Sequence, residues 1–228
     1  MWFITSQKSG GNALGLQRVL GLGSYQTAWA WLHKLRRAMV RPGRDRLRGC
    51  VEVDETYVGG EEEGVRGRET EDKAIVAVAA EEDGRGIGRI RLGRILDVSA
   101  ESLHPFIEEF VAPGSVIHTD GWPGYSGIER KGYTHKVTVL SKSDEPAHKL
   151  MPRVHRVASL LKRWLLGIHQ GAVSDKHLEY YLDEYTFRFN RRRSRARGLL
   201  FYRLLQNAVA VDPITYQGLV GGKKELDP

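Results

Sequence analysis

Three residues whose side chains can bind a hard metal ion stand in short, ordered stretches of this 228-residue chain. Asp54 lies in the strand-like segment VEVDETY (51–57), Asp120 in the turn HTDGW (118–122), and His155 in the helix-like segment VHRVASLLK (154–162). Phosphodiester cleavage with two divalent cations needs a few oxygen or nitrogen ligands held on rigid elements. The sequence therefore predicts that these three residues form a two-cation site that cuts nucleic acid.

The first of these ligands, Asp54, shares a strand face with other polar residues. In an alternating strand, Val51 and Val53 point to one face, whereas Glu52 and Asp54 point to the other. A carboxylate inside a strand costs free energy unless it is paired or binds a metal. A water-exposed aspartate on an edge strand is the alternative. Glu52 is the second choice as a ligand, and Glu55 ranks lower because it points the opposite way.

The other two ligands also have ordinary interpretations. Asp120 follows a short apolar strand, and strand ends are where α/β proteins place ligand groups. An Asp-Gly pair is equally typical of a simple turn. His155 forms a polar stripe with Ser159 and Lys162 on an amphipathic helix, which places an imidazole two turns from a phosphate-binding lysine. A surface histidine on an amphipathic helix is the alternative.

The order of expected elements indicates an α/β protein with a ribonuclease-H-like mixed sheet flanked by helices. We expect strands at 51–57, 73–80, 87–98, 115–119 and 133–139, and helices at 99–111, 154–168 and 174–190. The predicted organisation is a helical, DNA-binding-like segment with a basic linker (1–48), a catalytic domain (49–205) and a tail (206–228).

The N-terminal segment contains two expected helices within residues 12–39, separated by Gly21-Leu22-Gly23. This pattern suits a helix-turn-helix, and a plain helical hairpin packed on the core fits it nearly as well. In a helix-turn-helix, four side chains of the second helix would lie near the DNA groove: Tyr25, Gln26, Trp29 and His33.

Composition and charge narrow the class of protein. The single cysteine, Cys50, excludes a disulfide framework and a cysteine-based zinc cluster, so we expect an intracellular protein. The net charge is +8 over residues 1–50, −8 over 51–150 and +7 over 151–228. Basic ends would hold a polyanion and an acidic middle would attract cations. Chance clustering of solvated charges is the alternative.

A late arginine-rich stretch, residues 188–197, would contact phosphates without reading bases. A solvated helix end is the alternative. Together with two basic residues of the preceding helix, the candidate DNA contacts are Lys162, Arg163, Arg188, Arg191, Arg192, Arg193, Arg195 and Arg197.

Four motifs carry a resemblance to a known family: GCVEVDETYVGG (49–60), HTDGWPGY (118–125), VHRVASLLKRWLLGIHQG (154–171) and SDKHLEYYLDEYTFRFNRRR (174–193). The chain resembles ISXO-like insertion-sequence transposases of the DDE transposase and retroviral integrase superfamily. The resemblance implies a ribonuclease-H-like fold, two Mg²⁺ or Mn²⁺ ions, DNA ends and target DNA as partners, a homo-oligomeric active complex and a bacterial cytoplasmic location. Asp54 and Asp120 match the first two catalytic carboxylates, and His155 falls where many members carry the third.

Two departures from the family pattern shape the expectations. Members commonly begin with a cysteine-rich module that this sequence lacks, so a truncated, non-catalytic DNA-binding remnant or regulator is an alternative function. A nuclease or resolvase that cuts without joining is another. Because His155 replaces a carboxylate, we expect a preference for Mn²⁺ over Mg²⁺ and a loss of activity below about pH 6.5.

Overall fold

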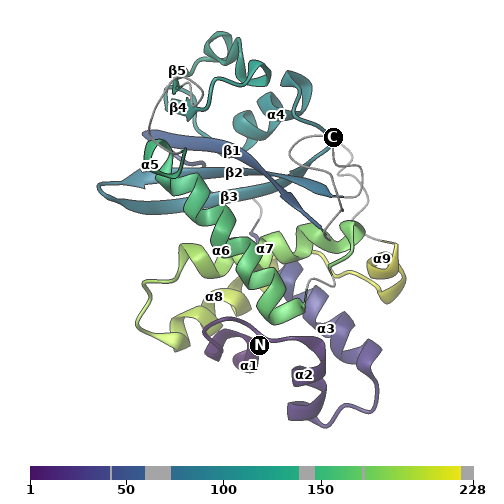
Figure 1. Ribbon diagram of the computed structural model, residues 1–228. Helices are drawn as coiled ribbons and strands as arrows, with labels where there is room; N and C mark the ends of the chain where they lie inside the picture. Colours follow the sequence, from purple (N-terminus) through teal and green to yellow (C-terminus); the bar gives the residue numbers. More distant parts are fainter. Residues whose placement is uncertain (42, 60–72, 139–146, 171–172, 222–228) are drawn as a thin grey trace. The chain divides into compact units, whose positions relative to one another are not determined.

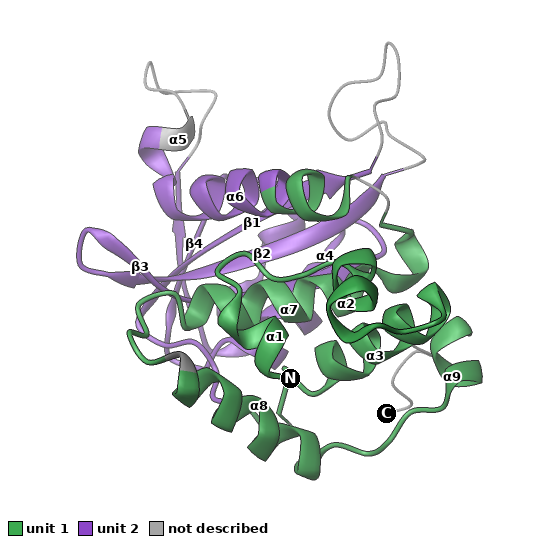
Figure 2. Cartoon of the chain, turned by 90° about the horizontal axis from the view of Figure 1, so that it is seen from below, with its two compact units in different colours: residues 1–44, 164–228 green, residues 45–163 purple. Residues whose placement is uncertain are grey.

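The computed structural model describes residues 1–41, 43–59, 73–138, 147–170 and 173–221. The chain divides into two compact units, which Figure 2 colours separately. Unit 1 comprises residues 1–44 and 164–228, and unit 2 comprises residues 45–163. The predicted boundary near residue 48 lies close to a unit boundary, whereas the units do not divide at residue 205.

Unit 2 is built on one five-stranded sheet (Figure 1). Its strands are β1 (Cys50–Val58), β2 (Ala74–Asp83), β3 (Gly86–Ile95), β4 (Val116–Thr119) and β5 (Thr134–Val137). The spatial order is β3-β2-β1-β4-β5. Strands β1 to β3 pair antiparallel, whereas β4 pairs parallel with both β1 and β5. The mixed α/β sheet expected from the sequence is therefore confirmed.

One face of this sheet carries the main apolar core of unit 2. Val51 and Val53 of β1 are fully buried there together with side chains of helix α4 (Ala100–Phe110), including Leu103 and Phe106. Gly93 of β3 lets the Phe106 ring approach closely, because a Cβ at this position would meet the ring at 3.1 Å. The alternation predicted for 51–57 thus sends its apolar residues to the α4 face, which leaves the even-numbered residues of β1 for the opposite face.

Helix α6 (Pro152–His169) begins in unit 2 and reaches the even-numbered face of β1 at Glu52. Its apolar stripe is buried at Val154, Val157 and Leu161, as the sequence predicted. Unit 2 also contains the short helix α5 (Ala147–Leu150) and two 3₁₀ turns, Pro123–Tyr125 and Ile128–Lys131.

Unit 1 is helical. It contains α1 (Trp2–Ser6), α2 (Ala13–Leu20), α3 (Tyr25–Arg37), α7 (Leu178–Asn190), α8 (Arg197–Ala210) and α9 (Tyr216–Val220), with a 3₁₀ turn at Asp175–His177. Helix α2 ends at Gly21 in a left-handed conformation (φ 61°), which confirms the predicted break between the two helices, and Ser24 is the N-cap of α3. Helices α8 and α9 were not predicted, and the expected tail from residue 206 contains the end of one and all of the other.

The interior of unit 1 changes the expectation for helix α3. His33 is fully buried and its ring centroid lies 4.2 Å from that of Trp29. The His33 side chain therefore packs inside unit 1, and the prediction that it faces a DNA groove is wrong, whereas Trp29 is half-buried against the core of this unit. Tyr25 and Gln26 are exposed, as predicted. Within the described residues, no helix is long and apolar enough to cross a membrane.

Candidate metal centre and nucleic-acid contacts

The two candidate aspartates belong to a pair of parallel strands. Asp54 lies in the middle of β1, and Asp120 is the first residue after β4. The paired residues of these strands end with Glu52 and His118, two residues before the aspartates. The negative charges of both aspartates raise the pKa of the same buried hydroxyl, that of Tyr125, so both carboxylates lie in the neighbourhood of that side chain.

His155 reaches Asp54 from the first turns of α6. Its Nδ1 atom lies 3.8 Å from the Oδ2 atom of Asp54, and the two side chains are 30% and 18% exposed. Imidazole and carboxylate ligands each bind a divalent ion at about 2.0–2.2 Å, so two ligands of one ion lie no more than about 4.4 Å apart. The contact is too long for a hydrogen bond and within the range that a shared cation allows.

Asp120 is oriented by its own turn. Its Oδ1 atom accepts a hydrogen bond from the backbone N–H of Trp122 at 3.0 Å, and Gly121 takes the left-handed conformation (φ 73°). The Trp122 indole donates to the carbonyl of Val98 at 2.8 Å, which fixes the loop further. The turn and ligand interpretations of Asp120 are therefore compatible, since the turn holds the carboxylate at the strand end.

A buried tyrosine lies beside this acidic edge. Tyr125 donates its hydroxyl to Oε2 of Glu55 at 3.1 Å. Burial raises the pKa of Tyr125 well above its usual value, and the negative charges of Glu55, Asp54 and Asp120 raise it further. The hydroxyl therefore stays protonated and holds Glu55, which the sequence had ranked below Asp54 as a ligand.

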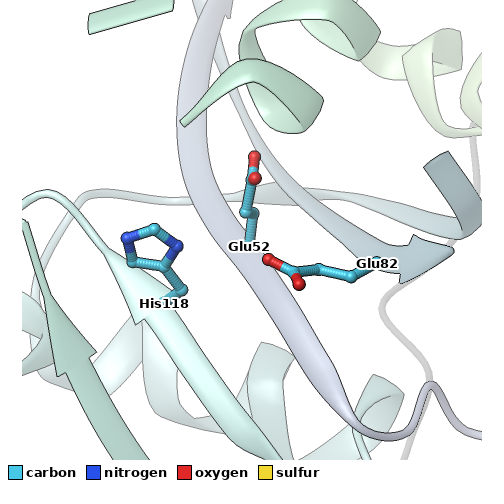
Figure 3. A group of neighbouring side chains, drawn as sticks. All are labelled: Glu52, Glu82 and His118. Atoms are coloured by element: carbon cyan, nitrogen blue, oxygen red, sulfur yellow. The ribbon is translucent and has the colours of Figure 1, made fainter. Parts of the chain in front are cut away.

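The three candidate ligands do not form one tight cluster. Among the described residues, the group whose ligand atoms all lie within 4.8 Å of one another is Glu52, Glu82 and His118 (Figure 3). Asp54, Asp120 and His155 do not meet that condition. Two cations about 3.5–4 Å apart do not require it, because each ion then uses only part of the ligand set.

Sequence reasoning missed Glu82 and the role of Arg153. The guanidinium of Arg153 contacts both Glu52, at 2.7 Å, and Glu82, at 3.0 Å. The sequence offered one indication that Glu52 and His118 belong together. They are separated by 66 residues, the same spacing as between Asp54 and Asp120. His118, which the sequence analysis did not treat as a ligand, pairs its Nε2 atom with Oγ1 of Thr138 at 2.7 Å.

Lys162 and Arg163 are the last two residues of α6 that belong to unit 2, and both are exposed. Burial of its stem lowers the pKa of Lys162, and the positive charge of Lys73 lowers it further. Ser159 donates its hydroxyl to the carbonyl of His155 at 2.8 Å, and the side chains of Ser159 and Lys162 are both exposed.

The arginines of unit 1 fall into different environments. Arg188 donates to Glu184 at 2.8 Å and to the carbonyls of Ile4 and Gln7, so its guanidinium is held inside the unit. The guanidinium carbons of Arg191 and Arg192 lie 4.1 and 4.0 Å from the ring centroids of Phe187 and Phe189. Arg193 and Arg195 are exposed, and the Arg197 side chain lies outside the described part of the chain.

Comparison with protein families decides the broad class. Residues 46–190 match the ISXO2-like transposase domain, which is more than half of the chain. The chain belongs to the ISXO2-like transposase family. The matched range contains Asp54, Asp120 and His155. Membership of this family and the mixed sheet flanked by helices together give the ribonuclease-H-like fold that the sequence predicted.

Other comparisons add little to this assignment. No curated protein matches the chain. One similar solved structure is a chain of the simian T-cell lymphotropic virus intasome in complex with the PP2A regulatory subunit B56 gamma. The identity is 14%, the TM-score is 0.41, and the match covers 96% of this chain and 73% of that chain.

Proposed function

We propose that this ISXO2-like transposase family member cuts DNA at the ends of an insertion sequence and joins those ends to target DNA. The substrate is double-stranded DNA, and Asp54, Asp120 and His155 hold two divalent cations. The observation that carries the proposal is the 3.8 Å contact between His155 and Asp54.

The donor set fits divalent cations. Two carboxylates and a neutral imidazole bring a charge of −2, and oxygen and imidazole ligands suit Mn²⁺ and, less well, Mg²⁺. When bound, such cations supply nucleophile activation and charge neutralisation at the phosphate. The set contains no thiolate, so soft metals gain no advantage from it.

The protein groups have separable tasks in this proposal. Asp54 is fixed in the middle of β1, between β2 and β4, and does not move with a loop. Asp120 is held by the Trp122 amide. Lys162 and Arg163 lie seven and eight residues after His155, where their charges would attract the DNA backbone. Arg193 and Arg195 extend this set as phosphate contacts, whereas Arg188 is left out because its donors are used within unit 1.

The test is incubation of the purified protein with a supercoiled plasmid that carries the element ends, with Mg²⁺ or Mn²⁺. The proposal predicts nicked and joined products that need the cation and disappear in Asp54→Ala and Asp120→Ala. Glu101→Ala, a change of an exposed carboxylate on α4, is the matched control and should retain activity. Nicking that persists in both aspartate variants would remove the proposed site.

The same assay separates the two alternatives. DNA binding without cation-dependent cutting would favour a non-catalytic DNA-binding regulator. Cutting without joined products, and without preference for the element ends, would favour a nuclease or resolvase.

A further inference from the structure

The buried carboxylate of Glu52 caps the start of helix α6. Its Oε2 atom accepts hydrogen bonds from the backbone N–H groups of Arg153, at 2.7 Å, and Val154, at 3.0 Å. These are the second and third residues of the helix, whose N–H groups have no partner within the helix itself. Pro152 occupies the first position, where its missing N–H is harmless. Glu52, a strand residue, therefore caps the N-terminus of α6 with its side chain. Its negative charge also interacts favourably with the positive end of the helix dipole.

Arg153 ties the same helix turn to the rest of the sheet. Its Nη1 atom bonds Oε1 of Glu52 at 2.7 Å and Oε1 of Glu82 at 3.0 Å. Its Nε and Nη2 atoms donate to the carbonyls of Gly86, at 3.0 Å, and Gly84, at 2.8 Å. One side chain thus contacts β1, β2 and the turn between β2 and β3. The first turn of α6 is fixed at several points.

A metal ion is the competing interpretation of this cluster. Glu52, Glu82 and His118 each offer a ligand atom within 4.8 Å of the others (Figure 3), and the buried Nδ1 atom of His118 has no hydrogen-bond partner among the described residues. The Arg153 guanidinium, however, already supplies a positive charge to both carboxylates. Burial and a hydrogen bond to Glu82 raise the pKa of Cys50 to about 11, so no thiolate is at hand for a soft metal.

We infer that Glu52 and Arg153 are positioning residues for His155. The inference rests on the function proposed above. Glu52 bonds Arg153, and Asp54 contacts His155, with the same separation of 101 residues along the chain in each pair. Both contacts join the start of α6 to β1, so the two elements meet at the Glu52–Arg153 hydrogen bonds, here called the clamp, and again at the candidate metal site. Fixing Arg153 sets the rotation of α6, and two residues later that rotation aims the imidazole at Asp54.

The experiment compares Arg153→Met, which keeps an apolar stem, with Arg89→Met as the matched control. Arg89 makes a comparable set of contacts on the same sheet, with Glu81 at 2.6 and 2.9 Å and the Arg46 carbonyl at 3.1 Å, but none of these partners is in α6. Each variant is assayed for Mn²⁺ affinity by calorimetry, for the ratio of cleavage rates in Mn²⁺ and Mg²⁺, and for thermal stability.

We expect Arg153→Met to weaken Mn²⁺ binding by about tenfold or more, as is typical when the groups around metal ligands are removed. The Mn²⁺/Mg²⁺ rate ratio should fall below that of the wild type, and Arg153→Lys should restore part of it. Arg89→Met should change the Mn²⁺ affinity and the Mn²⁺/Mg²⁺ rate ratio by less than about twofold. Its loss of thermal stability should be similar to that of Arg153→Met. Equal effects of the Arg153 and Arg89 substitutions would overturn the inference by showing that Arg153 is only structural.

Two further outcomes are decisive. If Arg153→Met binds a divalent ion more tightly, and His118→Ala abolishes the gain, Glu52, Glu82 and His118 are a metal site and the positioning role is wrong. Protection of the Val154 amide from hydrogen exchange is read in parallel, because it reports on the clamp without needing catalysis. Absence of DNA cleavage in the wild type would count against the proposed function alone, whereas unchanged Val154 protection in Arg153→Met and Glu52→Ala would count against the clamp alone.

Discussion

The Nδ1 atom of His155 lies 3.8 Å from Oδ2 of Asp54, a contact between the start of a helix and the middle of a strand. In a member of the ISXO2-like transposase family, this contact puts an imidazole beside a carboxylate on the central strand of the sheet. The identity of the metal and its strength of binding should therefore depend on residue 155.

Exchange of His155 for glutamate should change the metal preference. His155→Glu adds a carboxylate and removes the nitrogen ligand, so activity in Mg²⁺ should rise relative to activity in Mn²⁺. We expect the Mn²⁺/Mg²⁺ ratio of cleavage rates to fall by about tenfold, the lower end of effects seen around bound metals. His155→Ala, as the control, should lose activity in both metals. An unchanged ratio in His155→Glu would show that residue 155 does not contact the ions.

The arginines of unit 1 should separate into structural and DNA-binding groups. Glu184 is buried between Arg36 and Arg188 at 2.8 Å from each, so Arg188→Ala leaves an incompletely paired buried charge and should cost about 3–5 kcal/mol of stability. The exposed Arg193 and Arg195 should behave differently. Alanine at either position should leave stability unchanged and lower the slope of log affinity against log salt by about 0.9. Salt-dependent DNA binding and thermal unfolding check both, and a normal salt slope in both alanine variants would contradict the assignment.

Two buried histidines should make unit 1 sensitive to acid. Burial lowers the pKa of His33 to about 2 and that of His169 to about 4, with the positive charge of Arg36 adding to both effects. Below about pH 6.5 both histidines become protonated in the unfolded chain, whereas in the folded unit they stay neutral until the pH falls to their lowered pKa values. Stability is therefore complete above pH 6.5 and falls as the pH drops from there towards 4. His169→Gln should show a smaller fall in melting temperature between pH 7 and pH 5 than the wild type, and an identical fall would exclude this role.

The ion pair chosen as a control in unit 2 has its own pH signature. Burial opposes the charge of Glu81, but hydrogen bonds from Arg89 and from the Arg48 amide outweigh it and lower the pKa of Glu81. A lowered carboxyl pKa adds stability above the unfolded value of about 4.5 and loses it as the pH falls through the folded value. The stability difference between wild type and Arg89→Met should be about 1 kcal/mol at pH 7 and shrink at acid pH. A difference that grows on acidification would contradict it.

The sequence carried enough information to predict the sheet. Alternation along 51–57 put Asp54 opposite Val53, and the apolar stripe of α6 left His155 on the polar side, where the two side chains come within 3.8 Å of each other. The role of Asp54, Asp120 and His155 as metal ligands stays a prediction.

The remaining features depend on contacts between distant elements. Nothing local marks Glu52 as the cap of a helix that starts 100 residues later, because the capping residue normally precedes its own helix. His33 and Trp29 have helical spacing that fits a DNA-facing surface equally well, and only packing within unit 1 buries His33 and partly buries Trp29. Helix α8 was missed because the arginine-rich run before it resembles a solvated helix end.

Anomalous diffraction from crystals grown with Mn²⁺ tests the central claim most directly, because it locates each ion without a DNA substrate. The account predicts peaks beside Asp54, with Asp120 and His155 among the ligands, and none between Glu52 and Glu82, where Arg153 lies. Peaks at Glu52, Glu82 and His118 with none at Asp54 would contradict it.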